Sequence, residues 1–260
     1  MTREELIKIL SSLGMKPLKS QGQCFLLEES IADKMVEAAE IGENDKVLEV
    51  GPGLGTLSRR IIPKGCKYIG VEKDPRFIIW LKRNYEKENA KFIRGDALFM
   101  SPKDLFDLKE DEKIILISNT PFSITSQFLL WILKNKEFIK RCVITLQKEV
   151  VERLLAKPLS EIYCAMSVIM QVHFDIELLF KIRRLYFYPR PKVTPCVIRM
   201  FPKDLKFDYG FYDFMHKVFK HRMKLLKNVI RCEINRRVYE LEPYEFVKLY
   251  EIMKKKNLKK

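Results

Sequence analysis

The stretch "LEVGPGLGTLS", residues 48–58, joins an apolar, strand-like segment to the start of a helix. Its three glycines, Gly51, Gly53 and Gly55, lie in the connection, where glycine permits positive φ angles and a close approach of backbone to ligand. The G-x-G-x-G spacing, with a proline inserted, differs from the G-x-G-x-x-G fingerprint of dinucleotide-binding sites. Taken alone, the stretch indicates either a tight strand-to-helix turn or a ligand-binding loop.

Strands and helices alternate on both sides of this stretch. Apolar runs predict strands over 46–50, 68–71, 91–93, 114–117 and 141–146, and helices are predicted over 29–41, 55–62, 75–88 and 124–135. This alternation predicts an α/β fold, Rossmann-like, with a mostly parallel sheet and helices on both faces. Ligands of such folds bind at the carboxyl ends of the strands.

Polar side chains follow three of the predicted strands at that edge. Glu72 ends the second strand, 21 residues after Gly51, a placement that suits an acid holding the two hydroxyls of a ribose. Asp96 follows the third strand, where a carboxylate can accept a hydrogen bond from the exocyclic amine of adenine. Asn119 follows the fourth. Each alone could be an ordinary loop side chain, but together they predict a binding site.

The fourth strand ends in the stretch "ILISNTPFSIT", residues 115–125. Asparagine tolerates uncommon backbone angles and proline fixes φ, so Asn119 and Pro121 could simply stop the strand. Because the turn falls at the predicted ligand edge, we interpret it as part of the site instead.

The composition points to a globular, basic protein. The 260 residues are 47% hydrophobic, and 49 Lys and Arg against 34 Asp and Glu leave a net charge of +15, which favours a polyanionic partner. Without a membrane-spanning apolar run or a signal peptide, we expect a cytoplasmic protein that does not contact a membrane. The six cysteines and three histidines are scattered, so we expect reduced thiols and no metal site. We also expect a monomer.

Three segments differ in character. Residues 1–20 predict a helical extension, in which Thr2 and Glu5 form a capping box and Gly14 ends the helix. Residues 21–202 carry the strand–helix alternation. Residues 203–260 predict a small basic helical domain, helical over 208–236. In that domain we favour contacts with RNA phosphates over a merely solvated helix face for six side chains: Lys217, Lys220, Arg222, Lys224, Lys227 and Arg231.

Five motifs in this order resemble those of a known family. They are "GQCFL" (22–26), "EVGPGLGTLS" (49–58), "NTPFSIT" (119–125), "LQKEVVERL" (146–154) and "FYPRPKV" (187–193). The resemblance is to class I S-adenosylmethionine methyltransferases that modify adenine N6, and within them to the KsgA-type rRNA adenine dimethyltransferases. It implies a seven-stranded sheet, S-adenosylmethionine as cofactor, and rRNA in a small ribosomal subunit precursor as partner.

The resemblance also implies roles for individual residues. Gly51 and Gly53 would pass under the methionine part of the cofactor. Glu72 would hold the ribose hydroxyls and Asp96 the adenine amine. The N-terminal motif would bring two more cofactor contacts, Cys24 and Leu26.

At the target base, the side-chain oxygen of Asn119 and the backbone carbonyl of Thr120 would accept hydrogen bonds from adenine N6, in a turn made rigid by Pro121. Phe122 and Phe187 would stack on the base. Three positions depart from the family pattern: Cys24 replaces an Asn, Thr120 an apolar residue and Phe122 the commoner Tyr. None of them removes a group that the chemistry needs.

Other functions remain open at this point. An erythromycin-resistance-type methyltransferase of large-subunit rRNA would share most of the motifs. A DNA adenine methyltransferase is less favoured because no target-recognition insertion is visible. A non-catalytic RNA-binding assembly or transcription factor on the same scaffold, or a structural protein, would not need Glu72, Asp96 and Asn119 together.

Overall fold

The computed structural model describes residues 1–15 and 24–257 and divides into two compact units. One unit comprises Met1–Lys148 and Glu177–Phe201, and the other Glu149–Ile176 and Pro202–Lys260. The second unit thus includes a segment that the sequence assigned to the methyltransferase domain. The end of the predicted extension (16–20) and Gln21 to Gln23 of the first motif lie outside the described residues.

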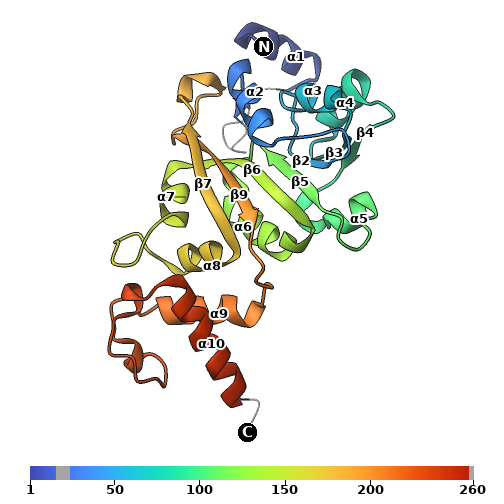
Figure 1. Ribbon diagram of the computed structural model, residues 1–260. Coiled ribbons are helices and arrows are strands. Elements are labelled where there is room, and N and C mark those ends of the chain that lie inside the picture. Colours follow the sequence, from blue (N-terminus) through green and yellow to red (C-terminus); the bar gives the residue numbers. More distant parts are fainter. Residues whose placement is uncertain (16–23, 258–260) are drawn as a thin grey trace. The chain divides into compact units, whose positions relative to one another are not determined.

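A mostly parallel sheet forms the centre of the first unit, as predicted (Figure 1). In residues 1–15 and 24–257 it has seven strands in the order β4-β3-β2-β5-β6-β9-β7. The first five are parallel, and β9 runs antiparallel to β6. Their bounds are β2 Lys46–Val50, β3 Lys67–Glu72, β4 Ala90–Arg94, β5 Ile114–Ser118, β6 Ile139–Gln147, β7 Phe174–Lys181 and β9 Pro195–Pro202.

The strand order reverses between β2 and β5, because the chain first builds β3 and β4 on one side of β2 and then returns to its other side. At such a reversal the connections leave the sheet in opposite directions and open a crevice at the carboxyl ends of the strands. This reversal is what positions the site.

Helices pack on both faces of the sheet. The helices α1 (Arg3–Ser12), α2 (Glu29–Ala38), α3 (Ser58–Ile61) and α4 (Pro75–Tyr85) share one buried apolar cluster with alternate strand residues such as Val47, Phe92 and Ile115. The neighbouring strand residues point to the other face, since side chains alternate along a strand. Two other helices, α5 (Pro102–Phe106) and α6 (Thr125–Lys134), contribute no residue to that cluster.

The N-terminal helix begins and ends as the sequence predicts. The Thr2 side chain accepts a hydrogen bond from the Glu5 backbone N–H, and the Glu5 carboxylate accepts one from the Thr2 N–H, which completes the capping box. Gly14 follows the last turn with a φ of 66°, a conformation that favours glycine and stops a helix.

The second unit is helical but less regular than predicted. It contains most of α7 (Lys148–Leu154), then α8 (Ala165–His173), α9 (Tyr209–Phe219) and α10 (Pro243–Asn257). Residues 149–176 join this unit because α8 packs against α9 and α10. Among the described residues no helix is both long enough and apolar enough to cross a membrane.

The predicted helix over 208–236 is wrong beyond Phe219. The chain folds back on itself there: the Leu226 N–H donates to the Arg236 carbonyl at 2.8 Å, and the Val238 N–H donates to the Lys224 carbonyl at 3.1 Å. These contacts between distant residues replace the local hydrogen bonds of a helix. Two short 3₁₀ turns, Leu226–Asn228 and Val238–Glu240, remain in this segment.

Candidate active site

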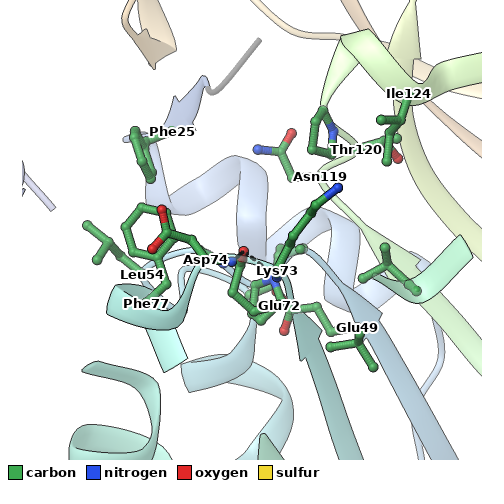
Figure 2. A pocket seen from close by; sticks show the side chains of 18 of the residues that line it. Phe25, Glu49, Leu54, Glu72, Lys73, Asp74, Phe77, Asn119, Thr120 and Ile124 are labelled. Atoms are coloured by element: carbon green, nitrogen blue, oxygen red, sulfur yellow. Dashed lines mark hydrogen bonds between the residues drawn. The ribbon is translucent and has the colours of Figure 1, made fainter. Parts of the chain in front are cut away.

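The site is a cavity of about 770 Å³ at the carboxyl ends of β2, β3, β4 and β5, a size within the range of pockets that bind small molecules. Figure 2 shows Glu72, Lys73 and Asp74 on one side and Asn119, Thr120 and Ile124 on another. The structure brings nearly all the predicted site residues of the first unit into its lining: Cys24, Leu26, Gly51, Gly53, Glu72, Asp96, Asn119, Thr120, Pro121 and Phe122.

The glycine loop forms the floor of the pocket. Gly51 and Gly53 have φ angles of 71° and 57°, which a residue with a side chain adopts only under strain. A Cβ on Gly53 would also lie 3.6 Å from the Phe25 ring, in space that faces the cavity. At these two positions the wall of the pocket is therefore bare backbone, which a ligand can approach closely.

Glu72 fixes this loop to the end of β3. Its carboxylate accepts hydrogen bonds from the backbone N–H groups of Gly53 (3.0 Å), Lys73 (2.8 Å) and Asp74 (2.9 Å). Burial raises the pKa of Glu72 above its usual value, in spite of these three donors. The three donors hold the carboxylate in one orientation at the pocket wall.

Asp96 is held from two sides. One carboxylate oxygen accepts a hydrogen bond from the Leu98 N–H at 3.1 Å, and the other lies 3.0 Å from the Lys73 ammonium nitrogen. The side chain of Lys73 is 80% exposed, so this ion pair is a surface contact at the pocket edge. Lys73 therefore donates to one oxygen of the carboxylate that is predicted to accept from an adenine amine.

The turn after β5 is fixed by side-chain hydrogen bonds. The Ser118 hydroxyl donates to the Val50 carbonyl at 2.7 Å, and the buried Thr120 hydroxyl donates to the Ser118 hydroxyl at 3.2 Å. The side-chain nitrogen of Asn119 donates to the Cys24 carbonyl at 3.3 Å. Since the nitrogen of this amide is engaged, its oxygen remains to accept hydrogen bonds from a ligand. Phe122 is half-buried at the start of a 3₁₀ turn, Phe122–Ile124.

Phe187 does not line the pocket, in contrast to the prediction. It pairs with Leu26 in a two-stranded antiparallel sheet of β1 (Phe25–Leu26) and β8 (Phe187–Tyr188), and only 3% of it is exposed. Its ring belongs to the apolar cluster that includes Leu26 and Ile182. In this structure Phe187 is therefore an aromatic residue that packs in the apolar interior.

The basic residues of the second unit fall into two groups. Five of the predicted RNA contacts have exposed side chains: Lys217, Lys220, Lys224, Lys227 and Arg231. Arg222 differs, because its guanidinium donates to the backbone carbonyls of Ser160 and Glu161 and lies 5.6 Å from the centre of the Tyr239 ring. The Arg222 guanidinium is therefore engaged within the protein, unlike the other five side chains.

Glu49 is a pocket residue that the sequence reasoning missed. It is 2% exposed, and its carboxylate accepts hydrogen bonds from the hydroxyls of Ser58 and Tyr68, both at 2.7 Å. Burial raises its pKa to about 7. An acidic residue inside an otherwise apolar strand was the available signal, because buried carboxyls need partners.

Apolar side chains close one end of the pocket. The sequence analysis did not predict them as site residues. Phe25 and Phe77 meet edge to face with ring centres 5.7 Å apart, and Leu54 lies beside them in Figure 2. Such residues carry no distinctive sequence signal, since the same apolar residue types occupy ordinary core positions.

The sheet order and the pocket at its reversal define a class I S-adenosylmethionine-dependent methyltransferase. A dimethyladenosine transferase from Plasmodium falciparum shares the fold with a TM-score of 0.79 at 21% identity, covering 90% of this chain and 98% of that one. The 23S rRNA methyltransferase ErmE shares it with a TM-score of 0.64 at 20% identity, covering 87% and 98%.

Sequence comparison then gives the family. The profile of the ribosomal RNA adenine dimethylase family matches residues 15–259, and the chain belongs to this family. A protein of Francisella tularensis subsp. novicida named ribosomal RNA small subunit methyltransferase A is 35% identical over 226 residues, which cover 85% of this chain and 86% of that protein. Its namesake from Chlorobaculum parvum is 36% identical over 216 residues, covering 82% and 77%.

Proposed function

We propose that the protein transfers methyl groups from S-adenosylmethionine to the N6 atoms of two adjacent adenines in a loop of small-subunit rRNA, within a precursor of the small ribosomal subunit. The observation that carries this proposal is the convergence of Glu72, Asp96 and Asn119 on one cavity beside the glycine loop. Relatives named for small-subunit rRNA methylation support the choice of substrate.

The pocket suits S-adenosylmethionine in shape and in chemistry. The open backbone at Gly51 and Gly53 would lie along the methionine part, Glu72 would accept from the ribose hydroxyls, and Asp96 from the adenine amine. The apolar end at Phe25 and Phe77 would exclude water from the bound molecule. When bound, the sulfonium supplies an electrophilic methyl group.

The turn after β5 would position the target base. Adenine N6 is a weak nucleophile, because its lone pair is delocalised into the ring. The side-chain oxygen of Asn119 and the backbone carbonyl of Thr120 would accept hydrogen bonds from its two hydrogens and favour a pyramidal nitrogen. Phe122 would stack on the extruded base.

A tuned general base is not required for this reaction. The nitrogen becomes strongly acidic once it is methylated, so its proton can leave to solvent after the methyl group arrives. Asn119 then acts by positioning and by stabilising developing positive charge, and not by taking the proton.

The exposed lysines of the second unit would contribute affinity for RNA without reading its sequence. Phosphate contacts of this kind give binding that weakens steeply with salt. Selection of the adenines would then depend on an unstacked loop whose bases can be splayed out.

The test is methyl transfer from labelled S-adenosylmethionine to immature small subunits, large-subunit rRNA and duplex DNA, followed by mass spectrometry of the nucleosides. The proposal expects dimethyladenosine on the small-subunit rRNA only. Label on large-subunit rRNA would place the protein with resistance-type enzymes. Binding of the cofactor without transfer to any substrate would favour a non-catalytic assembly or transcription factor.

A further inference from the structure

The most exposed large apolar side chain among the described residues is Phe99, which is 89% exposed. It ends the 3₁₀ turn Ala97–Phe99, directly after three residues that line the pocket, Asp96, Ala97 and Leu98. Its ring therefore projects to solvent at the rim of the site, where it is not part of the core.

The backbone of this turn is firmly held. The Phe99 N–H donates to the Asp96 carbonyl at 3.0 Å, and the Met100 N–H donates to the Ala97 carbonyl at 3.1 Å. The Trp131 indole N–H, from α6, donates to the Met100 carbonyl at 2.9 Å. The exposed ring thus extends from a fixed support, as a stacking platform requires.

Two exposed lysines are connected to the segment that carries Phe99, one through an ion pair and one through the chain. Lys73 is paired with Asp96, three residues before the ring, and its side chain is 80% exposed. Lys103 is exposed at the start of α5, four residues after it. An exposed aromatic ring near lysines is the combination that binds single-stranded nucleic acid, the ring by stacking and the lysines through phosphates.

We propose that Phe99 stacks on an unpaired base of the substrate RNA that neighbours the target adenine, with Lys73 and Lys103 facing the adjoining phosphates. This inference rests on the proposed function, because it supposes that the target adenine enters the pocket from a loop of the RNA. Extrusion of one adenine leaves its neighbour without a stacking partner, and Phe99 would replace that partner at the pocket rim.

The lysine paired with Asp96 adds a link to the cofactor. If the adenine amine of S-adenosylmethionine takes the oxygen that Lys73 now contacts, the ammonium is released toward the rim. The cofactor-bound protein should then bind RNA more tightly than the free protein.

The experiment compares the full-length protein with Phe99→Ala, Phe99→Trp and Ile79→Ala. Ile79 is the matched control, because it is 66% exposed in the same unit and does not line the pocket. Fluorescence anisotropy measures affinity for a hairpin RNA with two adjacent loop adenines, and calorimetry measures affinity for S-adenosylmethionine. Methyl transfer to immature small subunits is measured in parallel.

We expect Phe99→Ala to weaken RNA binding by about 5- to 150-fold, the usual effect of removing one stacked base, with cofactor affinity unchanged. Phe99→Trp should keep the affinity, and its added indole emission should be quenched by RNA. Ile79→Ala should behave as the wild type.

Equal RNA affinity of Phe99→Ala and the wild type would overturn the inference, whether or not methyl transfer occurs. If Phe99→Ala loses affinity while the wild type transfers no methyl group, the inference stands and the proposed reaction fails. If the wild type does not bind the RNA, the inference fails as well.

Discussion

The side-chain nitrogen of Asn119 donates a hydrogen bond to the backbone carbonyl of Cys24, 3.3 Å away and 95 residues earlier in the chain. The contact joins the N-terminal motif to the turn that we propose as the catalytic element. Because the acceptor is a main-chain atom, it is available whichever side chain stands at position 24. The replacement of the family's Asn by Cys24 therefore leaves the orientation of Asn119 intact. Burial raises the pKa of the Cys24 thiol, which keeps it neutral.

Asn119→Ala should lower kcat for methyl transfer by about 10²- to 10³-fold, because it removes an acceptor aimed at the reacting nitrogen. The affinity for S-adenosylmethionine should change much less. The control is Asn84→Ala, since the Asn84 amide is exposed and also donates to a backbone carbonyl, that of Trp80. Single-turnover rates measure the effect, and an unchanged rate in Asn119→Ala would rule out this role.

Lys73→Met should raise the affinity for S-adenosylmethionine, because the cofactor amine no longer competes with the ammonium for Asp96. Exposed ion pairs contribute little, so we expect a gain of up to about fivefold at low salt that shrinks as salt is added. Lys91→Met, at an exposed lysine outside the pocket, serves as the control. Calorimetric titration at two salt concentrations checks this, and weaker binding by Lys73→Met would contradict it.

Glu49 should make stability depend on pH. Its pKa is raised to about 7 in the folded protein, from 4.5, so between these values the folded state keeps a proton that the unfolded chain releases. The free energy of unfolding should then fall as the pH rises through this window, by up to about 1.4 kcal/mol per pH unit.

Glu49→Gln removes this titration, and the comparison isolates it. Urea unfolding of both proteins at pH 5, 6, 7 and 8 should show the wild type losing stability relative to Glu49→Gln as the pH rises. A constant difference across the series would mean that Glu49 does not hold a proton in the folded state.

Arg222→Ala should mainly lower the stability of the protein, whereas Lys220→Ala should mainly change its binding of RNA. The Arg222 guanidinium donates to carbonyls of residues 160 and 161, so its loss should cost about 1–3 kcal/mol of stability. Lys220 is exposed, and its loss should change stability by less than about 0.5 kcal/mol.

RNA binding gives the second half of that comparison. If Lys220 contacts a phosphate, Lys220→Ala should reduce the slope of log K against log salt by about 1. Thermal unfolding and salt titrations of RNA affinity measure the two effects. An unstable Lys220→Ala variant would contradict the surface role of Lys220, and a fully stable Arg222→Ala variant would contradict the structural role of Arg222.

The sequence by itself determined the α/β class, the alternation of strands and helices, and the edge at which the site lies. The strand predicted over 46–50 matches β2, and that over 114–117 differs from β5 by one residue. Parallel strands bring their carboxyl ends to one edge. The positions of Glu72, Asp96 and Asn119 after successive strands were therefore enough to predict that they meet.

Only the tertiary structure decided how individual side chains are used. Phe187 lies in a recognisable motif, yet it is buried opposite Leu26. Arg222 lies in a run of basic residues, yet its guanidinium donates a hydrogen bond to the backbone carbonyl of Glu161, 61 residues earlier in the chain. Phe99 showed no sequence signal, because its exposure depends on what packs around it. Burial and pairing arise from contacts between residues far apart in the chain, and a local pattern carries no information about which distant group will occupy the neighbouring space.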